Sequence, residues 1–247
     1  MQNFKLFLEY DGSKFAGWQR QADARTVQGE IEKAFQQVLG NPVSVIGAGR
    51  TDAGVHARGM VANVRIAENP PECDAIHSFL RGILPTDIVC NSVENADENF
   101  HARFDAVLRT YTYAVSRRKI AIGRAYAWHV PAHLDIDALH AAADYAVGSH
   151  DFTAFSKENP EVKNRVCVVS ESFWRETGDM LCYTISADRF IFSMVRALVG
   201  AMVNCGRGKL SPHDFHKILF SRDRNKNANP LAPPHGLCLE KVEYRRT

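Results

Sequence analysis

Features that would place this chain of 247 residues in a special class are missing from it. The six cysteines are scattered and form no C-x-x-C pair, so neither a zinc site nor a disulfide framework is indicated, and we expect reduced thiols. No apolar run approaches the roughly 20 residues that a membrane-spanning helix needs. The sequence therefore predicts a cytoplasmic protein without a targeting segment, a metal or a membrane partner.

An excess of charge of either sign is also missing. The net charge is +2 and the isoelectric point is about 8.2, far from the strongly basic balance of a nucleic-acid-binding tail. Any contact with RNA must therefore come from local patches, each of which alone is more often an ordinary solvated surface. The candidate patches contain Arg20 and Arg25, residues 117–119, Arg207 with Lys209, residues 222–226, and Arg245 with Arg246.

Two series of alternating and helical patterns follow one another along the chain. Each has the order strand, helix, strand, strand, helix, strand, which is the split βαβ order of a ferredoxin-like unit. Predicted strands span 4–10, 43–46, 60–66 and 88–93, then 109–115, 166–174, 180–187 and 237–244. Predicted helices span 26–40 and 74–84, then 136–147, 189–205 and 211–220.

These patterns predict an α+β protein built from two ferredoxin-like halves. The polar segment 95–99 is the expected crossing point, which gives an N-terminal half of residues 1–96 and a C-terminal half of residues 97–247. Antiparallel sheets side by side, with helices on one side, would leave a central cleft. We expect the active site in that cleft, because such grooves are where ligand sites commonly form.

One turn concentrates side chains that can do chemistry. After the strand that ends at Ile46, Gly47 and Gly49 allow a sharp bend and a close approach of a ligand to the backbone. Residues 49–56 then read Gly-Arg-Thr-Asp-Ala-Gly-Val-His. An Asp beside a Gly more often forms a turn that hydrogen-bonds to its own backbone than a catalytic site. On the pattern alone, both interpretations of Asp52 stay open.

The predicted helix at 189–205 carries a second polar feature. Two arginines and two small residues fall there at helical spacing and form one narrow stripe: Arg189, Ser193, Arg196 and Gly200. Such a stripe is more often a solvated face. Glycine nevertheless costs about 1 kcal/mol relative to alanine inside a helix, which indicates close packing at Gly200. An arginine on this stripe is suited to pair with a carboxylate or a phosphate through its fork of donors.

Together these segments resemble the TruA-type tRNA pseudouridine synthases over nearly the whole chain. The octapeptide around Asp52 is the most specific part of the resemblance. Small departures occur at Phe190-Ile191 and at Arg58-Gly59-Met60, and neither touches a residue with a chemical role. The other matching segments are 8–12, 17–21, 26–29, Phe104, 109–113, 151–155, 194–196 and 232–237.

The resemblance implies an activity and a role for four residues. It implies an isomerase without a small-molecule cofactor that converts uridines at positions 38 to 40 of the tRNA anticodon stem-loop to pseudouridine, and it implies a homodimer. Asp52 would be the catalytic nucleophile, and Arg50 would help to displace and hold the target nucleotide. Tyr111 would stack on the target uracil, and Arg196 would keep Asp52 ionised.

Two other functions stay open for the sequence. A non-catalytic RNA-binding protein with two RRM-like units is disfavoured, because Met60 and Ala62 stand where the stacking aromatic residues of an RNP1 strand belong. A metal-assisted hydrolase that uses Asp52 and His56 is disfavoured, because the spacing of Asp52, His56 and His101 as metal ligands matches no standard site. Without the resemblance, Tyr111 is better explained as a core residue of a strand.

Overall fold

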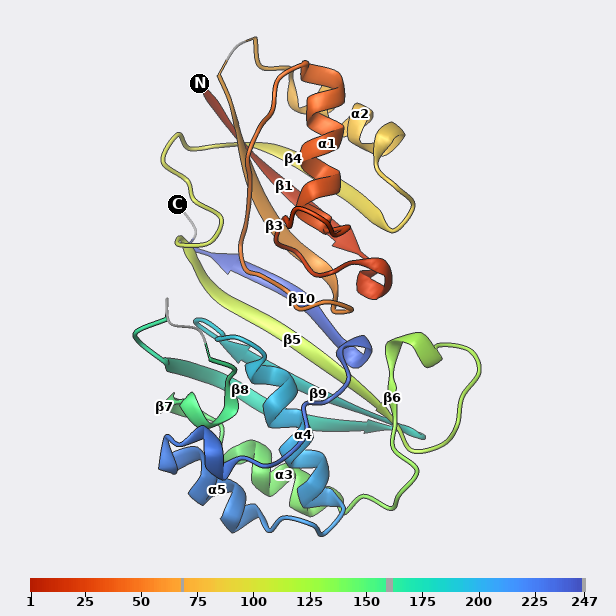
Figure 1. Ribbon diagram of the computed structural model, residues 1–247, viewed down its shortest axis with the longest axis vertical. Helices are drawn as coiled ribbons and strands as arrows, with labels where there is room; N and C mark the ends of the chain where they lie inside the picture. The colour runs from red at the N-terminus through yellow and green to blue at the C-terminus, as the bar shows by residue number, and fades with distance from the viewer. Residues whose placement is uncertain (68, 159–161, 246–247) are drawn as a thin grey trace. The chain divides into compact units, whose positions relative to one another are not determined.

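The computed structural model describes residues 1–67, 69–158 and 162–245 (Figure 1). It divides into two compact units: unit 1 contains residues 1–107 and the C-terminal segment that begins at Cys238, and unit 2 contains residues 108–237. This division differs from the predicted boundary after residue 96. Unit 1 includes the last strand of the chain because that strand pairs with the strand that begins at His56. Arg246, of the last predicted basic patch, lies outside the described residues.

Unit 1 contains a mixed set of strands with two helices. The strand β1 is antiparallel to β3 and to β4, and β2 is antiparallel to β3, which gives the order β4-β1-β3-β2. β10 runs parallel to the start of β3 through the pairs Cys238 with His56 and Leu239 with Ala57. The elements are β1 (Gln2–Tyr10), α1 (Val27–Leu39), β2 (Val45–Gly47), β3 (His56–Ile66), α2 (Cys73–Ile83), β4 (Ile88–Ala96) and β10 (Leu237–Tyr244).

Local chemistry explains where the helices of unit 1 begin, end and pack. The side chain of Thr26 accepts a hydrogen bond from the Gly29 amide and starts α1, and Gly40 ends it with a left-handed φ of 75°. α1 and α2 lie side by side (Figure 1), with the rings of Phe35 and Phe79 5.4 Å apart in an edge contact. The two helices therefore close one hydrophobic core over their strands.

Unit 2 is a second set of strands with three helices that pack together. The strands follow the order β5-β9-β8-β7 in antiparallel pairs, and the short β6 lies parallel to β5. β6 and β7 were not predicted, because two and four residues are too few to show a period. The elements are β5 (Ala106–Ser116), β6 (Trp128–His129), α3 (Ile136–Asp144), β7 (Gly148–Asp151), β8 (Val166–Thr177), β9 (Met180–Ala187), α4 (Met194–Gly206) and α5 (Pro212–Ser221).

The helix predicted at 189–205 begins later than expected. Ser193 adopts a left-handed φ of 59° and precedes the first helical residue, so α4 starts at Met194. Arg189 and Ser193 therefore lie outside the helix, and the predicted four-residue stripe is wrong. The expected close packing at Gly200 is confirmed, since a Cβ atom there would lie 2.0 Å from the carbonyl oxygen of Pro230.

The described residues contain ten strands and five α-helices, which confirms the α+β class. None of these helices combines the length and the apolar character needed to cross a membrane. All six cysteines are free thiols, as predicted. Burial raises the pKa of the thiols of Cys90, Cys167, Cys205 and Cys238 to about 12.

Candidate active site

Asp52 lies in a tight turn between β2 and β3. The Val55 amide donates to the Asp52 carbonyl oxygen at 3.2 Å, and Gly54 adopts the left-handed φ of 79° that this turn requires. The Asp52 side chain is half-buried, and Arg50 is exposed two residues earlier. The turn is thus closed by a backbone carbonyl, and the carboxylate lies next to an arginine that can reach solvent.

Residues on both sides of Asp52 are fixed by the loop that follows β1. The Tyr10 hydroxyl and Thr51 Oγ1 form a buried hydrogen bond of 2.8 Å, and the Trp18 amide donates to the Thr51 carbonyl oxygen at 3.1 Å. On the other side, the Gly54 amide donates to the Phe15 carbonyl oxygen at 3.3 Å. These bonds fix the backbone on both sides of Asp52, which suits a residue that must present a reacting group in a defined place.

Glycines allow the loop and the turn to approach so closely. A Cβ atom at Gly12 would lie 2.0 Å from the Val55 carbonyl oxygen. Gly17 has a φ of 101°, and a Cβ atom there would lie 2.7 Å from the Thr51 carbonyl oxygen. Since neither backbone can move without disturbing the turn, these two positions require glycine.

The two glycines before Asp52 differ in their surroundings. Gly47 is the last residue of β2, and a Cβ atom there would lie 2.5 Å from the ring of Trp18, which is buried. A Cβ atom at Gly49 would meet nothing within 4 Å. Packing therefore demands the first glycine, while the second borders open space next to Arg50.

His56 supports the same loop. Its ring is buried, and Nδ1 lies 3.0 Å from the Gly12 amide nitrogen and 3.1 Å from Asp11 Oδ1. Nδ1 accepts from Gly12 when it carries no proton, and it donates to Asp11 when it does. In either state, this nitrogen binds the loop at Asp11 or Gly12 and helps to hold it in place. No group of three or more His, Cys, Asp or Glu that could hold a metal occurs among the residues that the model describes.

A polar network joins the amide side chains of the first helix and of the loop after β1. Gln28 Oε1 accepts from Gln19 Nε2 and from the Arg20 amide, both at 2.9 Å. Gln28 Nε2 donates to Glu32 Oε1 at 2.9 Å, and Glu32 Oε2 lies 3.1 Å from Arg20 Nη1. The network ties α1 to the loop that carries Trp18.

Several arginines of the predicted basic patches form ion pairs within the protein. Arg25 binds Asp87 through two hydrogen bonds of 2.7 and 2.8 Å, and its guanidinium lies 4.2 Å from the centre of the Phe15 ring. In unit 2, two pairs of 2.6 Å link Arg117 to Glu176 and Arg118 to Asp179. These pairs reduce the positive charge that the patches can offer to RNA.

Tyr111 and Tyr113 follow one another on the same side of β5 but have different environments. The Tyr113 hydroxyl donates to the Pro233 carbonyl oxygen at 2.8 Å, and burial raises the pKa of its phenol, against the opposing effect of the Arg196 charge. Tyr111 is 8% exposed, and its ring meets Phe190 edge-on at 5.0 Å. Tyr113 also meets the Trp128 ring edge-on, at 6.4 Å. Both tyrosines are therefore buried with a ring contact, and Tyr111 is the one whose side chain keeps a small exposed part.

Arg196 lies in the first turn of α4, where a segment before β10 holds it. Its Nε donates to the Ala232 carbonyl oxygen at 2.8 Å, and the Ala232 amide donates back to the Arg196 carbonyl oxygen at 3.0 Å. The missing side chain of Gly200, one turn further along α4, lets this segment approach. Arg50 and Asp52 belong to unit 1, and Tyr111 and Arg196 to unit 2, so the action of all four on one substrate stays a prediction.

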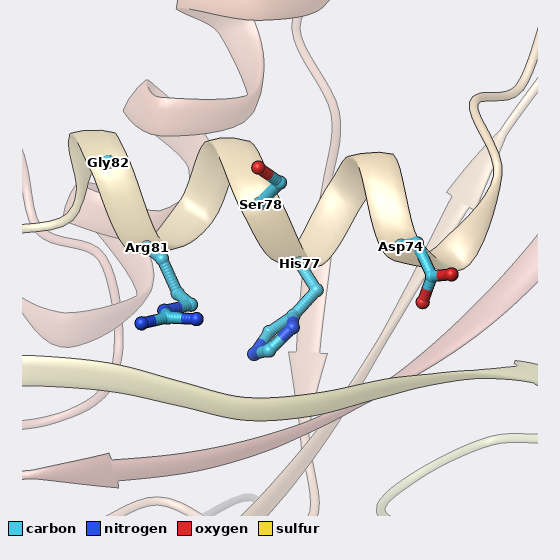
Figure 2. A pocket seen from close by; sticks show the side chains of 5 residues that line it. All are labelled: Asp74, His77, Ser78, Arg81 and Gly82. Carbon is cyan, nitrogen blue, oxygen red and sulfur yellow. The ribbon is translucent and has the colours of Figure 1, made fainter.

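A polar cavity of about 480 Å³ lies elsewhere in unit 1, along α2. Figure 2 shows Asp74, His77 and Arg81 projecting from the same side of this helix. The His77 ring is engaged with the Cys90 carbonyl oxygen at 3.0 Å. None of the predicted site residues lines the cavity, so it is distinct from the Asp52 turn.

Comparisons with known proteins agree with the motifs. A family model described as tRNA pseudouridine synthase matches residues 6–105 and 142–245, which include the Asp52 turn and Arg196 but not Tyr111. The chain is 42% identical over 246 residues to tRNA pseudouridine synthase A of Brevibacillus brevis, with 99% of this chain and 100% of the relative covered. It is 39% identical over 246 residues to tRNA pseudouridine synthase A 2 of Clostridium perfringens, with the same coverage. It is 40% identical over 248 residues to the synthase A of Porphyromonas gingivalis, with 99% and 98% covered.

Proposed function

The chain belongs to the tRNA pseudouridine synthase family, and we propose that it isomerises uridines at positions 38 to 40 of the tRNA anticodon stem-loop, with Asp52 as the nucleophile. The observation that carries this proposal is the mounting of Asp52. Hydrogen bonds to Thr51 and Gly54 fix the turn on both sides of the carboxylate. A turn needed only to reverse the chain would not require two buried aromatic residues and two crowded glycines to hold it.

The reaction suits a carboxylate held in this way. The bond from ribose C1′ to uracil N1 breaks, the uracil turns, and a bond from C1′ to C5 forms while the hydrogen of C5 leaves as a proton and N1 takes up a proton. No electrons are gained or lost overall. A carboxylate can form a covalent intermediate and thereby divide one difficult step into two easier ones. Three routes conserve atoms and electrons: attack of Asp52 on the sugar, attack of Asp52 on the base, and elimination at the sugar.

The other three predicted residues have complementary roles in this proposal. Arg50 is exposed beside Asp52 and would occupy the space left by the displaced nucleotide. A base must leave its stack at a cost of a few kcal/mol, and stacking on Tyr111 would return about 1 to 3 kcal/mol of it. Arg196 would pair with Asp52 during the reaction and keep it ionised.

Three further parts of the proposal concern architecture and setting. The strand order β4-β1-β3-β2 in unit 1, with helices after β1 and β3, supports a ferredoxin-like N-terminal half, and we extend this to the C-terminal half by element order. The enzyme would be cytoplasmic, where tRNA is modified. It would act as a homodimer, so sedimentation equilibrium at micromolar concentration should give twice the chain mass of 27.6 kDa.

The site of reaction can be tested with unmodified tRNA transcripts. Each transcript would keep one uridine at position 38, 39 or 40, and a control transcript would keep uridines only outside the anticodon stem-loop. After incubation with the enzyme, pseudouridine is mapped by carbodiimide treatment and primer extension. We expect stops at the retained stem-loop uridines and none in the control. Modification of the control alone would contradict the assignment of the stem-loop.

A further inference from the structure

An aromatic ring on the surface of unit 1 has no part in the site described above. The Phe104 side chain is 73% exposed, the largest value for an aromatic residue in the part of the chain that the model describes. Burying a phenylalanine stabilises a fold by about 1.5 to 3 kcal/mol. Because most of this ring is exposed, it provides only a small part of that stabilisation in the structure.

The turn that carries Phe104 is held firmly by its own hydrogen bonds. His101 Nδ1 accepts from the amides of Arg103 and Phe104 at 3.2 and 3.3 Å. The His101 amide donates to Asp105 Oδ2 at 2.8 Å, and the Asp105 amide donates to the His101 carbonyl oxygen at 3.1 Å. The exposed position of the ring is therefore built into the turn.

Buried contacts fasten the turn to the strands. Ala102 is fully buried, and its amide donates to Asn63 Oδ1 at 2.9 Å while its carbonyl oxygen accepts from the Tyr244 hydroxyl at 2.8 Å. Asn63, itself only 1% exposed, also donates to Asn3 Oδ1 at 3.0 Å. Ala102 is thus anchored in the core, and Phe104, two residues later, projects its ring into solvent.

The surroundings of Phe104 suit a nucleic-acid base better than a protein surface. The His101 ring lies 4.3 Å from it at a tilt of 35°, and the Arg103 guanidinium lies 5.6 Å from its centre. Arg103 and Asp105 are exposed and charged, so Phe104 is not part of a contiguous apolar patch along the turn, as a protein partner would require. A base needs only one ring face with a cation beside it.

We propose that Phe104 is an RNA contact that stacks on an unpaired base of the tRNA substrate, with Arg103 beside it to meet a phosphate. The contact would position the substrate outside the reacting centre. It rests on the proposed function for the identity of the RNA. Because the ring is already fixed in the free protein, stacking would lose little conformational freedom.

Conservative variants test the stacking. Phe104→Leu keeps an apolar side chain without a π face, Phe104→Tyr keeps the ring, and Phe220→Leu removes a different ring that is 55% exposed. We expect Phe104→Leu to raise the Kd and KM for tRNA about tenfold, with kcat changed less than about twofold. For Phe104→Tyr and Phe220→Leu, the Kd and KM for tRNA should stay within about twofold of the values of the unaltered protein. All three variants should keep the melting temperature of the unaltered protein, since the rings of Phe104 and Phe220 are mostly exposed.

A spectroscopic measurement adds direct evidence. In Phe104→Trp, the introduced indole should lose fluorescence when the anticodon stem-loop RNA is added, beyond any change in the unaltered protein. Unchanged Kd and KM in Phe104→Leu, while the unaltered enzyme forms pseudouridine, would overturn the contact and leave the reaction standing. A ring-dependent Kd without any pseudouridine formation would support the contact and refute the reaction. A marked fall in melting temperature on Phe104→Leu would also overturn the contact, since it would show that the ring supports the fold.

Discussion

The Tyr10 hydroxyl lies 2.8 Å from Thr51 Oγ1, in a buried hydrogen bond that joins the end of β1 to the residue before Asp52. Tyr10 is 3% exposed and its ring lies 6.1 Å from the ring of Trp18, whose amide donates to the Thr51 carbonyl oxygen. The position of the turn that carries the proposed nucleophile is therefore set by buried groups outside the turn. This relationship makes Tyr10 a positioning residue.

Removing that hydroxyl should affect the rate more than binding. We expect Tyr10→Phe to lower kcat about tenfold, because small displacements of a reacting group reduce rates strongly. KM for tRNA should stay within about twofold, and stability should fall by about 1 kcal/mol for the lost hydrogen bond. Thr51→Val removes the same bond, so the double variant should be no slower than either single variant. Steady-state kinetics of all three would check this, and additive losses in kcat would contradict a shared bond.

Glycines of the turn should differ in their tolerance of alanine. Gly17→Ala introduces a Cβ atom 2.7 Å from the Thr51 carbonyl oxygen at a left-handed φ, so we expect a loss of about 2 kcal/mol in the free energy of unfolding. Gly49→Ala is the matched control, with open space around it, and it should change stability by less than about 0.5 kcal/mol. Urea denaturation measures both. Equal losses would show that crowding by the loop does not hold the turn.

The Arg25–Asp87 pair should make stability depend on pH. Hydrogen bonds from Arg25 hold the pKa of Asp87 below its usual value of 3.8. The stabilisation is therefore fully present above about pH 4 and is lost as the pH falls through the lower pKa of the folded state. Since the Arg25 side chain is 35% exposed, solvent screening limits the contribution to about 1 kcal/mol.

Asp87→Asn removes this pair and provides the measurement. Its free energy of unfolding should be lower than that of the unaltered protein by about 1 kcal/mol at pH 7, and the difference should shrink as the pH falls below about 4. Glu30→Gln is the control, because the Glu30 carboxylate is the more distant partner of Arg25 at 3.5 Å. A difference that does not change between pH 7 and pH 3 would contradict the ion pair as its cause.

Alanine in place of a helical glycine should have opposite effects in the two units. Gly200→Ala places a Cβ atom 2.0 Å from the Pro230 carbonyl oxygen, and it should displace the segment whose Ala232 carbonyl holds Arg196 Nε. We expect a loss of about 2 kcal/mol in stability and at least about tenfold in kcat. Gly82→Ala in α2 has open space and should stabilise by up to about 1 kcal/mol. Thermal unfolding and kinetics of both would show whether packing at Gly200 matters.

The ends of several helices could be predicted from the sequence, because a helix cap depends only on residues next to it in the chain. Thr26 and Gly40 bound α1, and Ser211 caps α5 with Pro212 in the first turn, as their residue types indicate. The start of α4 could not be predicted, because Ser193 has a left-handed backbone conformation that a serine in the sequence does not indicate. Nothing in the sequence of β10 shows that it pairs with β3 some 180 residues away along the chain.

The sequence singles out Asp52 and its turn as a candidate site, but it does not show which groups hold that turn in place. The motif around Asp52 identified the turn, but the hydrogen bond from Tyr10 and the packing of Trp18 on Gly47 join segments that are distant in sequence. A signal was present in the excess of aromatic and amide residues in the loop 13–21. Only the fold shows that this loop packs against the turn that carries Asp52.

The central claim is that Asp52 carries out the isomerisation, and release of tritium from tRNA labelled at C5 of uracil tests it most directly. The label must leave C5 if C1′ is to bond there. We predict release by the unaltered protein and by Asp74→Ala, which alters an exposed aspartate in the same unit, and no release by Asp52→Ala, with its tRNA Kd within about threefold of the unaltered value. Release by Asp52→Ala at the rate of the unaltered protein would contradict the assignment of the nucleophile.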